Sequence, residues 1–297
     1  MKLFRFRTIS AALALTLGGA MLVSPSSASA ADSYPDAKRI VSLGGTVTEI
    51  IYALGAGDRV IAVDTTSLYP PEATAKPNVG YMRQLSAEGI LAQQPDLILA
   101  EAGAGPPDTI SILKASSAPV VTIPTPPTVE GIAPKIRAVG AVLGKTKEAE
   151  ALASDVEARL AALEKDIQAI PAPRKKVLFA LSVANGRMMA AGSDTAANAV
   201  IGLAGGENAT AAMTGYKPVN DEAVIAAAPE VLLVMENGGA RVTQEEAFAL
   251  PSLQSSPAAA NKAFIAMDGL YLLGLGPRTP EAARDLAAKL YPDAIKP

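Results

Sequence analysis

One stretch, from Thr146 to Ile170, constrains the fold of this chain more than any other. Its apolar residues recur at spacings of three and four, with charged residues between them: Leu152, Val156, Leu160, Leu163, Ile167 and Ile170. This spacing predicts one long amphipathic helix, which Pro171 and Pro173 end. At 1.5 Å per residue the helix would be about 35 Å long, whereas a flexible linker would be rich in Gly, Ser or Pro. We therefore expect a rigid helix that joins two parts of the chain.

Short β-type runs alternate with helical patterns on both sides of this helix. Before it, the sequence predicts strands at 39–43, 60–63, 97–100 and 119–123, and helices at 46–54, 87–93 and 108–116, the first capped by Thr46 or Thr48. After it, the sequence predicts strands at 176–181 and 231–234, a helix at 195–203 and a helix that ends at 227. Such alternation indicates α/β structure with parallel sheets. We predict two Rossmann-like α/β lobes, residues 31–145 and 171–297, joined by the helix at 146–170, with a ligand in the cleft between the lobes.

Two internal correspondences support a pair of related lobes. Residues 86–97 match residues 220–231, and in both segments a Glu lies seven residues before a Pro, as in Glu88 and Glu222. The segment that begins at Thr46 likewise resembles the segment that begins at Thr195. Because both matches occur in the same order, they favour two copies of one architecture.

The first thirty residues read as an export signal. Basic residues precede an apolar run from Ile9 to Val23, and Ala28-Ser29-Ala30 follows as a cleavage site. This pattern is typical of a secretory signal peptide, residues 1–30, whereas a membrane anchor needs about 20 apolar residues. The mature chain would begin at Ala31. The sequence has no cysteine, which excludes a lipidated N-terminal Cys, so we expect a periplasmic protein that is not a lipoprotein.

The composition excludes several classes of function. The chain has no histidine and no cysteine, so it has no Ser-His-Asp triad, no Cys-His pair and no His-based zinc site. A net charge of −3 without a long basic run argues against nucleic acid as a partner. A hydrolase would need a Ser-Lys or paired-carboxylate site, and the chain lacks a Gly-x-Ser-x-Gly motif. We therefore expect a protein that is not an enzyme.

The segment Gly80–Glu88 carries the most informative polar residues. Tyr81 offers a phenolate, an anionic donor that suits Fe(III), and Tyr is an established type of haem axial ligand. Arg83, and Arg241 from the second lobe, are available to stabilise a phenolate or to pair with haem propionates. The alternatives are ordinary ones, namely a packed tyrosine and two solvated arginines.

Apolar, adaptable side chains are expected to form the wall of such a pocket. Candidates are Met82 and the segment 270–276, which contains Tyr271, together with Met188, Met189 and Met213. The alternative for each methionine is a place in the core.

Glu88 and Glu222 occupy first-turn positions of two predicted helices, after the candidate caps Ser86 and Asn220. An acidic residue there complements the helix dipole. The other interpretation is that one exposed carboxylate on each lobe docks onto basic residues of a partner protein. The two interpretations are compatible.

Four segments carry a family resemblance: residues 79–89, 198–208, 215–218 and 271–278. On these, the chain resembles periplasmic haem-binding proteins of ABC-type haem importers, which are related to vitamin B12 and ferric-siderophore binding proteins. The resemblance implies two lobes joined by a rigid helix, ferric haem b as the transported ligand, and Tyr81 as the ligand of its iron. It also implies that Glu88 and Glu222 dock onto an inner-membrane ABC permease. Arg83 and Arg241 would lie near the tyrosinate or the propionates. A monomer, supplied by an outer-membrane haem receptor system, is expected.

One departure from the family bears on haem coordination. Some relatives have a His from the second lobe at the position of Val183, and this chain has none. We therefore expect five-coordinate ferric haem bound through Tyr81, or a weak sixth ligand such as water or a Met. The alternatives are a carrier of a ferric siderophore or cobalamin, whose sites tend to be rich in aromatic residues or Arg, and a secreted hydrolase without His.

Overall fold

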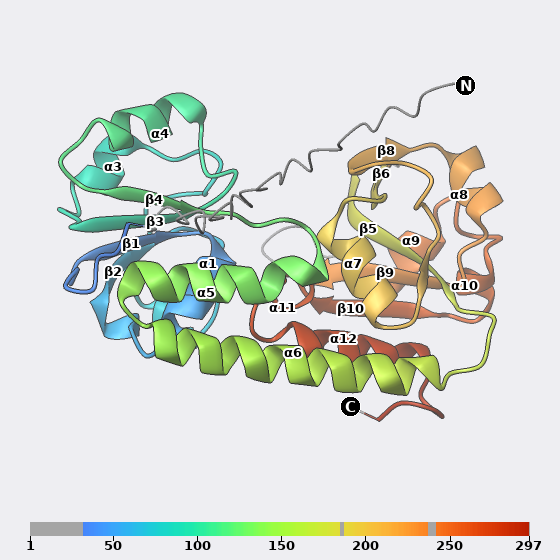
Figure 1. Cartoon of the computed structure of the whole chain (residues 1–297). Helices are drawn as coiled ribbons and strands as arrows, with labels where there is room; N and C mark the ends of the chain where they lie inside the picture. Colours follow the sequence, from blue (N-terminus) through green and yellow to red (C-terminus); the bar gives the residue numbers. More distant parts are fainter. Residues whose placement is uncertain (1–31, 185–186, 237–241, 297) are drawn as a thin grey trace, which may run out of the picture. The chain divides into compact units, whose positions relative to one another are not determined.

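A computed structural model describes residues 32–184, 187–236 and 242–296 and contains two β-sheets (Figure 1). The first sheet consists of β1 Ile40–Leu43, β2 Val60–Val63, β3 Leu97–Glu101 and β4 Val120–Ile123 in the order β2-β1-β3-β4. All of its strands are parallel, with Ile40 paired to Val60 on one side and to Leu97 on the other. The predicted parallel sheet in this part of the chain is confirmed.

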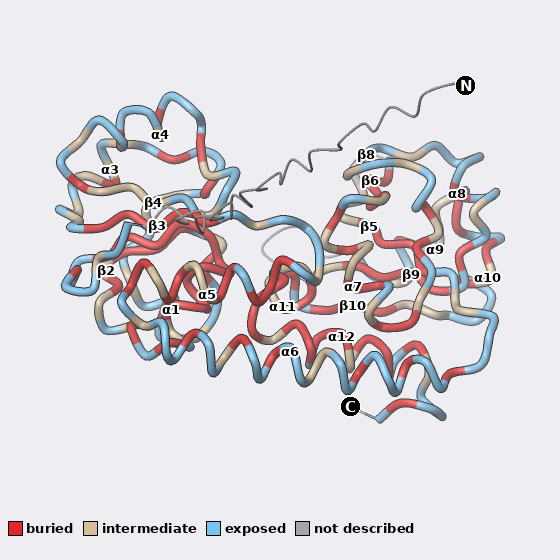
Figure 2. Tube along the Cα trace, viewed as in Figure 1, coloured by how far each residue is buried: buried red, intermediate tan, exposed pale blue. Residues whose placement is uncertain are grey.

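Helices cover both faces of the first sheet. Ile40 and Leu97 pack on one face with α1 Gly45–Ala53 and α5 Ile132–Leu143, while their neighbours Val41 and Ile98 pack on the other face with α3 Ala87–Leu91 and α4 Pro107–Lys114. Successive strand residues point to opposite faces, so a strand covered on both sides must be apolar throughout. Figure 2 shows these strands as buried. Polar side chains that contact a ligand are therefore expected at the carboxyl ends of the strands rather than along their buried lengths.

The second sheet is mixed rather than uniformly parallel. Its strands are β5 Lys176–Ala184, β6 Arg187–Ala191, β7 Glu207–Asn208, β8 Tyr216–Val219, β9 Val231–Glu236 and β10 Phe264–Asp268. Their order is β10-β9-β5-β6-β8, and β7 pairs with β5. β5, β9 and β10 are parallel, whereas β6 is antiparallel to both β5 and β8. β6 begins three residues after β5 ends, and strands so close in sequence pair antiparallel because a parallel pair needs a long crossover.

The long helix predicted from the apolar spacing is α6 Thr146–Gln168, with 23 residues (green, Figure 1). It ends two residues before the predicted bound, and its length is about 35 Å. It packs against α5 near its beginning and against α7 Ala196–Leu203 and α12 Thr279–Leu290 further along. The residues that it buries are Ala149, Ala153, Val156, Leu163 and Ile167. One apolar cluster runs through α6 and includes side chains from both sheets, so α6 supports both at once.

Helix α5 was not predicted from the sequence. It contains Pro134 in its first turn, where proline is tolerated, and Gly140 in its interior, where glycine is unfavourable. A Cβ atom at Gly140 would lie 2.2 Å from the Cβ of Ala149 on α6. The glycine is therefore required for the close packing of α5 on α6.

Ser86 and Asn220 are confirmed as helix caps. The Ser86 hydroxyl accepts a hydrogen bond from the Gly89 amide at 3.3 Å, and the Asn220 side chain accepts one from the Ala223 amide at 2.9 Å. These residues begin α3 and α8 Asp221–Ala227 respectively. The matching sequence segments thus have matching local structure.

The correspondence extends to the start of the first strand in each sheet. The Asp96 carboxylate accepts hydrogen bonds from the Lys38 and Arg39 amides, both at 2.8 Å, and the Glu230 carboxylate accepts one from the Lys176 amide at 2.9 Å. Both acidic residues follow the proline of the matched segments. The same type of carboxylate-to-backbone hydrogen bond at equivalent positions supports two related lobes.

The other helices are short: η1 Gly57–Arg59, α2 Pro71–Thr74, η2 Val129–Gly131, α9 Gln244–Phe248, α10 Pro257–Ala260 and α11 Gly269–Leu273. Across the described residues, no helix combines the length and the apolar character that crossing a membrane requires.

Candidate functional site

A cavity of about 630 Å³ is lined by residues from both halves of the chain. From the first half these are Gly45, Thr46, Thr65, Thr66, Leu68, Tyr81, Met82, Arg83, Glu101, Thr125, Pro126, Pro127 and Lys135. From the second half they are Ala196, Met235, Gly269, Leu270, Leu273, Gly274 and Leu275. The volume lies in the range of small-molecule sites, and three of the predicted site residues line this cavity. Another cavity, of about 570 Å³, lies beside α5, α6 and α7 and is lined by none of them.

Tyr81 projects from a loop whose backbone is held from two sides. The Asn78 side chain accepts a hydrogen bond from the Gly80 amide at 2.8 Å, and the Gly80 carbonyl accepts one from the Thr65 amide at 2.9 Å. Gly80 has φ +101°, a conformation that side chains rarely adopt. The Tyr81 side chain is 43% exposed and lines the cavity. The phenol is therefore accessible to a ligand in the cavity.

Arg83 and Met82 lie beside Tyr81 in the cavity wall. Met82 is 8% exposed and Arg83 is exposed. Arg83 acts electrostatically on Tyr216 of β8: burial raises the pKa of the Tyr216 phenol, and the Ala197 amide, the Thr195 hydroxyl and the Arg83 guanidinium oppose that rise. The Arg83 charge therefore reaches the second sheet as well as the Tyr81 loop.

Two other residues were predicted for the site, Arg241 and Tyr271. Arg241 lies outside the described residues. Tyr271 is on α11, where Leu270 and Leu273 line the cavity and Tyr271 does not. Its hydroxyl donates to the Asp285 carboxylate at 2.9 Å, and burial together with Asp285 raises the pKa of Tyr271.

Of the four methionines predicted for the cavity wall, the structure places only Met82 there. Met82 and Met235 line the cavity. Met188 is buried in the core of the second sheet, where Met213 packs against the same cluster, and neither they nor Met189 line the cavity. For those three the alternative of core or sheet packing is the better description.

Glu88 and Glu222 are both exposed in the first turns of α3 and α8. Each lies two residues after its confirmed cap. Their positions are compatible with both the dipole interpretation and the docking interpretation.

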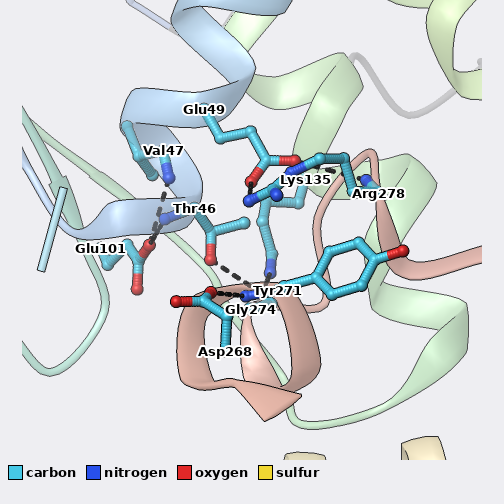
Figure 3. A network of polar contacts seen from close by, with 9 residues as sticks. All are labelled: Thr46, Val47, Glu49, Glu101, Lys135, Asp268, Tyr271, Gly274 and Arg278. Atoms are coloured by element: carbon cyan, nitrogen blue, oxygen red, sulfur yellow. Dashed lines mark hydrogen bonds and ion pairs between the residues drawn. The ribbon is translucent and has the colours of Figure 1, made fainter. Parts of the chain in front are cut away.

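Glu101 is a cavity residue that was not predicted. It stands at the carboxyl end of β3, the place where ligand-binding groups gather in parallel sheets. Its Oε1 atom accepts hydrogen bonds from the Thr46 amide at 2.8 Å and the Val47 amide at 3.1 Å (Figure 3). The expected caps Thr46 and Thr48 are therefore wrong: α1 begins after Gly44, and a carboxylate 55 positions away from Thr46 satisfies its first amides.

Lys135 of α5 is the other unpredicted charge in the cavity wall. It is 3% exposed, and its Nζ donates to the carbonyls of Leu275 at 3.1 Å and Gly274 at 3.4 Å. Burial lowers the pKa of Lys135, and Glu101 opposes this. Burial raises the pKa of Glu101 against the effects of Lys135 and the two amides. Glu101 and Lys135 thus each partly offset the effect of burial on the pKa of the other.

Replacing Glu101 with Gln is expected to change how stability depends on pH. The folded protein raises the Glu101 pKa above its ordinary value of 4.5, so it holds a proton that the unfolded chain releases as the pH rises. Rising pH therefore removes stability between these two pKa values, and the Gln variant has no such loss. The free energy of unfolding of the variant minus that of the original protein should increase as the pH rises above about 4.5 in urea titrations. A difference that stays constant or falls would contradict the direction of the shift.

The polar side chains of the cavity wall decide what kind of ligand it can bind. Within the described residues, no group of three or more His, Cys, Asp or Glu side chains is placed to hold a metal ion. The cavity instead offers one exposed phenol with a guanidinium beside it. That set provides one axial oxygen donor and one site for an anionic substituent.

Comparisons with known proteins identify a family and several similar structures. The family described as periplasmic binding protein matches residues 40–270. The periplasmic haem-binding protein RhuT from Roseiflexus sp. RS-1, in apo form, has a similar structure, with TM-score 0.81, 41% identity and coverage of 86% of this chain and 99% of that one. A periplasmic haem-binding protein from Pseudomonas aeruginosa has TM-score 0.80 and 33% identity, over 87% and 94% of the chains. The vitamin B12-binding protein of Vibrio campbellii is 31% identical over 208 residues, 68% of this chain and 74% of its own.

Proposed function

Because the chain belongs to the periplasmic binding protein family, we propose that it binds ferric haem and delivers it to an inner-membrane ABC permease. Members of this family are binding proteins that act outside the cytoplasm, and the chain is accordingly not an enzyme. Its two-lobe α/β fold is the one seen in haem-binding relatives.

The observation that carries the haem proposal is the exposed Tyr81 phenol in the cavity, with Arg83 two residues away. A phenolate is a suitable axial ligand for ferric haem, and a guanidinium stabilises the anionic phenolate or a propionate. We propose Tyr81 as the ligand of haem b iron, with Met82 as part of the wall and Arg241 as a further cation. The chain has no histidine, so the iron would be five-coordinate or have water or a Met in sixth place.

Cobalamin is the second candidate, since curated relatives include vitamin B12-binding proteins. Thermal unfolding in the presence of each ligand distinguishes the two. A ligand that binds the native state at about one hundred times its Kd stabilises it by about 2.7 kcal/mol. Ferric haem should raise the midpoint, while cobalamin and a ferric siderophore should leave it unchanged. A rise with cobalamin alone would replace haem by cobalamin as the cargo.

The remaining parts of the proposal concern export and organisation. We propose residues 1–30 as a signal peptide, which lies outside the described residues, and residues 31–145 and 171–297 as lobes joined by the helix at 146–170. The chain contains no cysteine that a lipid could modify, so the mature protein would be free in the periplasm. A monomer that receives haem from an outer-membrane receptor system fits this arrangement.

Docking on the permease is proposed to use Glu88 and Glu222. Changing both to Lys should reduce haem transport by the cognate permease in proteoliposomes by more than about tenfold, because like charges would then face basic residues of the permease. Haem binding in solution should stay unchanged, since neither residue lines the cavity. The matched control is Glu148→Lys, which reverses another exposed first-turn carboxylate, on α6. Equal transport by the double variant and the control would contradict this docking surface.

A further inference from the structure

We propose that Arg278 is a positioning residue for Tyr81, which it holds through the residue 64–69 loop that borders the cavity. This inference rests on the proposed haem function. Arg278 precedes α12 and belongs to the second half of the chain, whereas its partners Glu49 and Tyr69 belong to the first half.

Arg278 contacts its partners in three ways: through its backbone amide, through its charge and through the flat face of its guanidinium. Its guanidinium lies 2.8 Å from Glu49 Oε2, and its backbone amide donates to Glu49 Oε1 at 3.3 Å (Figure 3). The guanidinium carbon also lies 3.5 Å from the centre of the Tyr69 ring and 5.1 Å from that of Tyr271. Cation–π contacts of this kind stabilise most when they are shielded from water. Tyr271, which does not line the cavity, thus contacts Arg278 instead.

Glu49 is the buried partner of Arg278 in this ion pair. It is 5% exposed on α1, while the Arg278 side chain is 25% exposed. The first residue of α1 is also bonded to the 64–69 loop, since the Gly45 amide donates to the Thr66 hydroxyl at 3.0 Å. Arg278 therefore reaches the 64–69 loop twice, through α1 and through Tyr69.

The loop is in turn bonded to the backbone next to Tyr81. The Thr65 amide donates to the Gly80 carbonyl at 2.9 Å, and the Val79 amide donates to the Val63 carbonyl at 2.9 Å. The contact path thus runs from Arg278 to Tyr69, along the loop backbone to Thr65, and through the hydrogen bond of Thr65 to Gly80, the residue before Tyr81. An iron ligand depends on such supporting contacts for its orientation, and losing one typically weakens metal affinity tenfold to a hundredfold.

Neighbouring contacts bring the same C-terminal segment against the cavity. The Thr46 hydroxyl donates to the Gly274 carbonyl at 2.8 Å, and Lys135 donates to Leu275. These contacts join the two halves of the chain independently of Arg278. Its removal should therefore disturb the loop while the halves stay together.

The test compares Arg278→Gln and Tyr69→Leu with the control Arg284→Gln. Arg284 is on α12, the helix that follows Arg278, and its guanidinium pairs with Asp166 of α6 at 2.7 Å. Arg278→Lys is added because it keeps the charge but loses the planar fork, and Tyr69→Leu alters an exposed side chain that folding is less sensitive to. The measurements are the ferric haem spectrum, the rate of haem transfer to apomyoglobin, and hydrogen–deuterium exchange of peptides from residues 64–84 without haem.

We expect Arg278→Gln to transfer haem about tenfold faster, to shift the tyrosinate spectrum, and to exchange faster at residues 64–84. Tyr69→Leu and Arg278→Lys should show the same changes to a smaller degree, and Arg284→Gln should match the original protein. Unchanged transfer and spectrum in Arg278→Gln, even with a lower thermal midpoint, would overturn the positioning role. Failure of the original protein to bind haem would overturn the proposed function, and unchanged exchange at residues 64–84 in Arg278→Gln would overturn the contact path. Faster exchange in Arg278→Gln would then place the fault in the ligand rather than in the contact path.

Discussion

Replacing Tyr81 with Phe is expected to lower the affinity for ferric haem by at least about a hundredfold. Loss of a supporting contact alone weakens metal sites by about tenfold to a hundredfold, and Tyr81 is proposed as the ligand itself. The variant should also lose the high-spin spectrum of a ferric tyrosinate complex, because phenylalanine has no oxygen donor. Fluorescence quenching and absorbance titrations measure both effects.

The fold should tolerate this substitution. Tyr81 is 43% exposed. The hydrogen bonds that hold the Gly80 backbone come from Asn78 and Thr65 and do not use the Tyr81 hydroxyl. A matched control is Tyr69→Phe, which changes another exposed tyrosine beside the cavity and keeps the ring that Arg278 stacks on. Haem binding by Tyr81→Phe that equals binding by this control would show that another residue ligates the iron.

Replacing Glu49 with Ala is expected to have the largest effect on stability. The substitution leaves the Arg278 charge without the carboxylate that both its guanidinium and its amide contact. Breaking a buried pair by removing one partner costs about 3–5 kcal/mol, and we expect about 3 kcal/mol because Arg278 keeps 25% of its side chain exposed. Urea denaturation measures the free energy of unfolding directly.

The comparison for this prediction is Glu150→Ala. Glu150 also pairs with an arginine, Arg137 at 2.8 Å, but both side chains are exposed, at 58% and 37%. Exposed ion pairs contribute little because water and salt screen them. Similar losses of stability in the two variants would mean that burial of Glu49 does not strengthen its pair with Arg278.

The architecture was largely predictable because its signals are local. Apolar runs of four or five residues mark the strands that helices cover on both faces, and the spacing of Val156, Leu163 and Ile167 marks α6. Capping signals are similarly local, so Ser86 and Asn220 were recognised from sequence. The cap of α1 was not, because its amides are satisfied by Glu101 from another strand.

Elements that depend on tertiary packing were missed. Helix α5 contains a proline and a glycine, and Gly140 makes sense only once Ala149 of α6 is seen against it. The antiparallel β6 and β8 pair on the edge of the second sheet, where the alternation of strands and helices gives no signal of direction. In both cases the partner element determines the structure.

The candidate site likewise contains residues that the sequence reveals and residues that only the tertiary structure brings together. Tyr81, Met82 and Arg83 are adjacent in sequence, and the structure brings all three to the cavity. Lys135 and the pair formed by Glu49 and Arg278 bring together residues more than a hundred positions apart. No local pattern announces such pairs, although the position of Glu101 after a parallel strand was a usable signal.

We propose above that this cavity binds one ferric haem through a tyrosinate. An absorbance titration of the purified protein with ferric haem, repeated with cyanocobalamin, tests it most directly. We expect saturation at one equivalent of haem with a high-spin tyrosinate spectrum, and no saturable change with cobalamin. Haem absorbance that rises without saturation, or saturation by cobalamin alone, would contradict it.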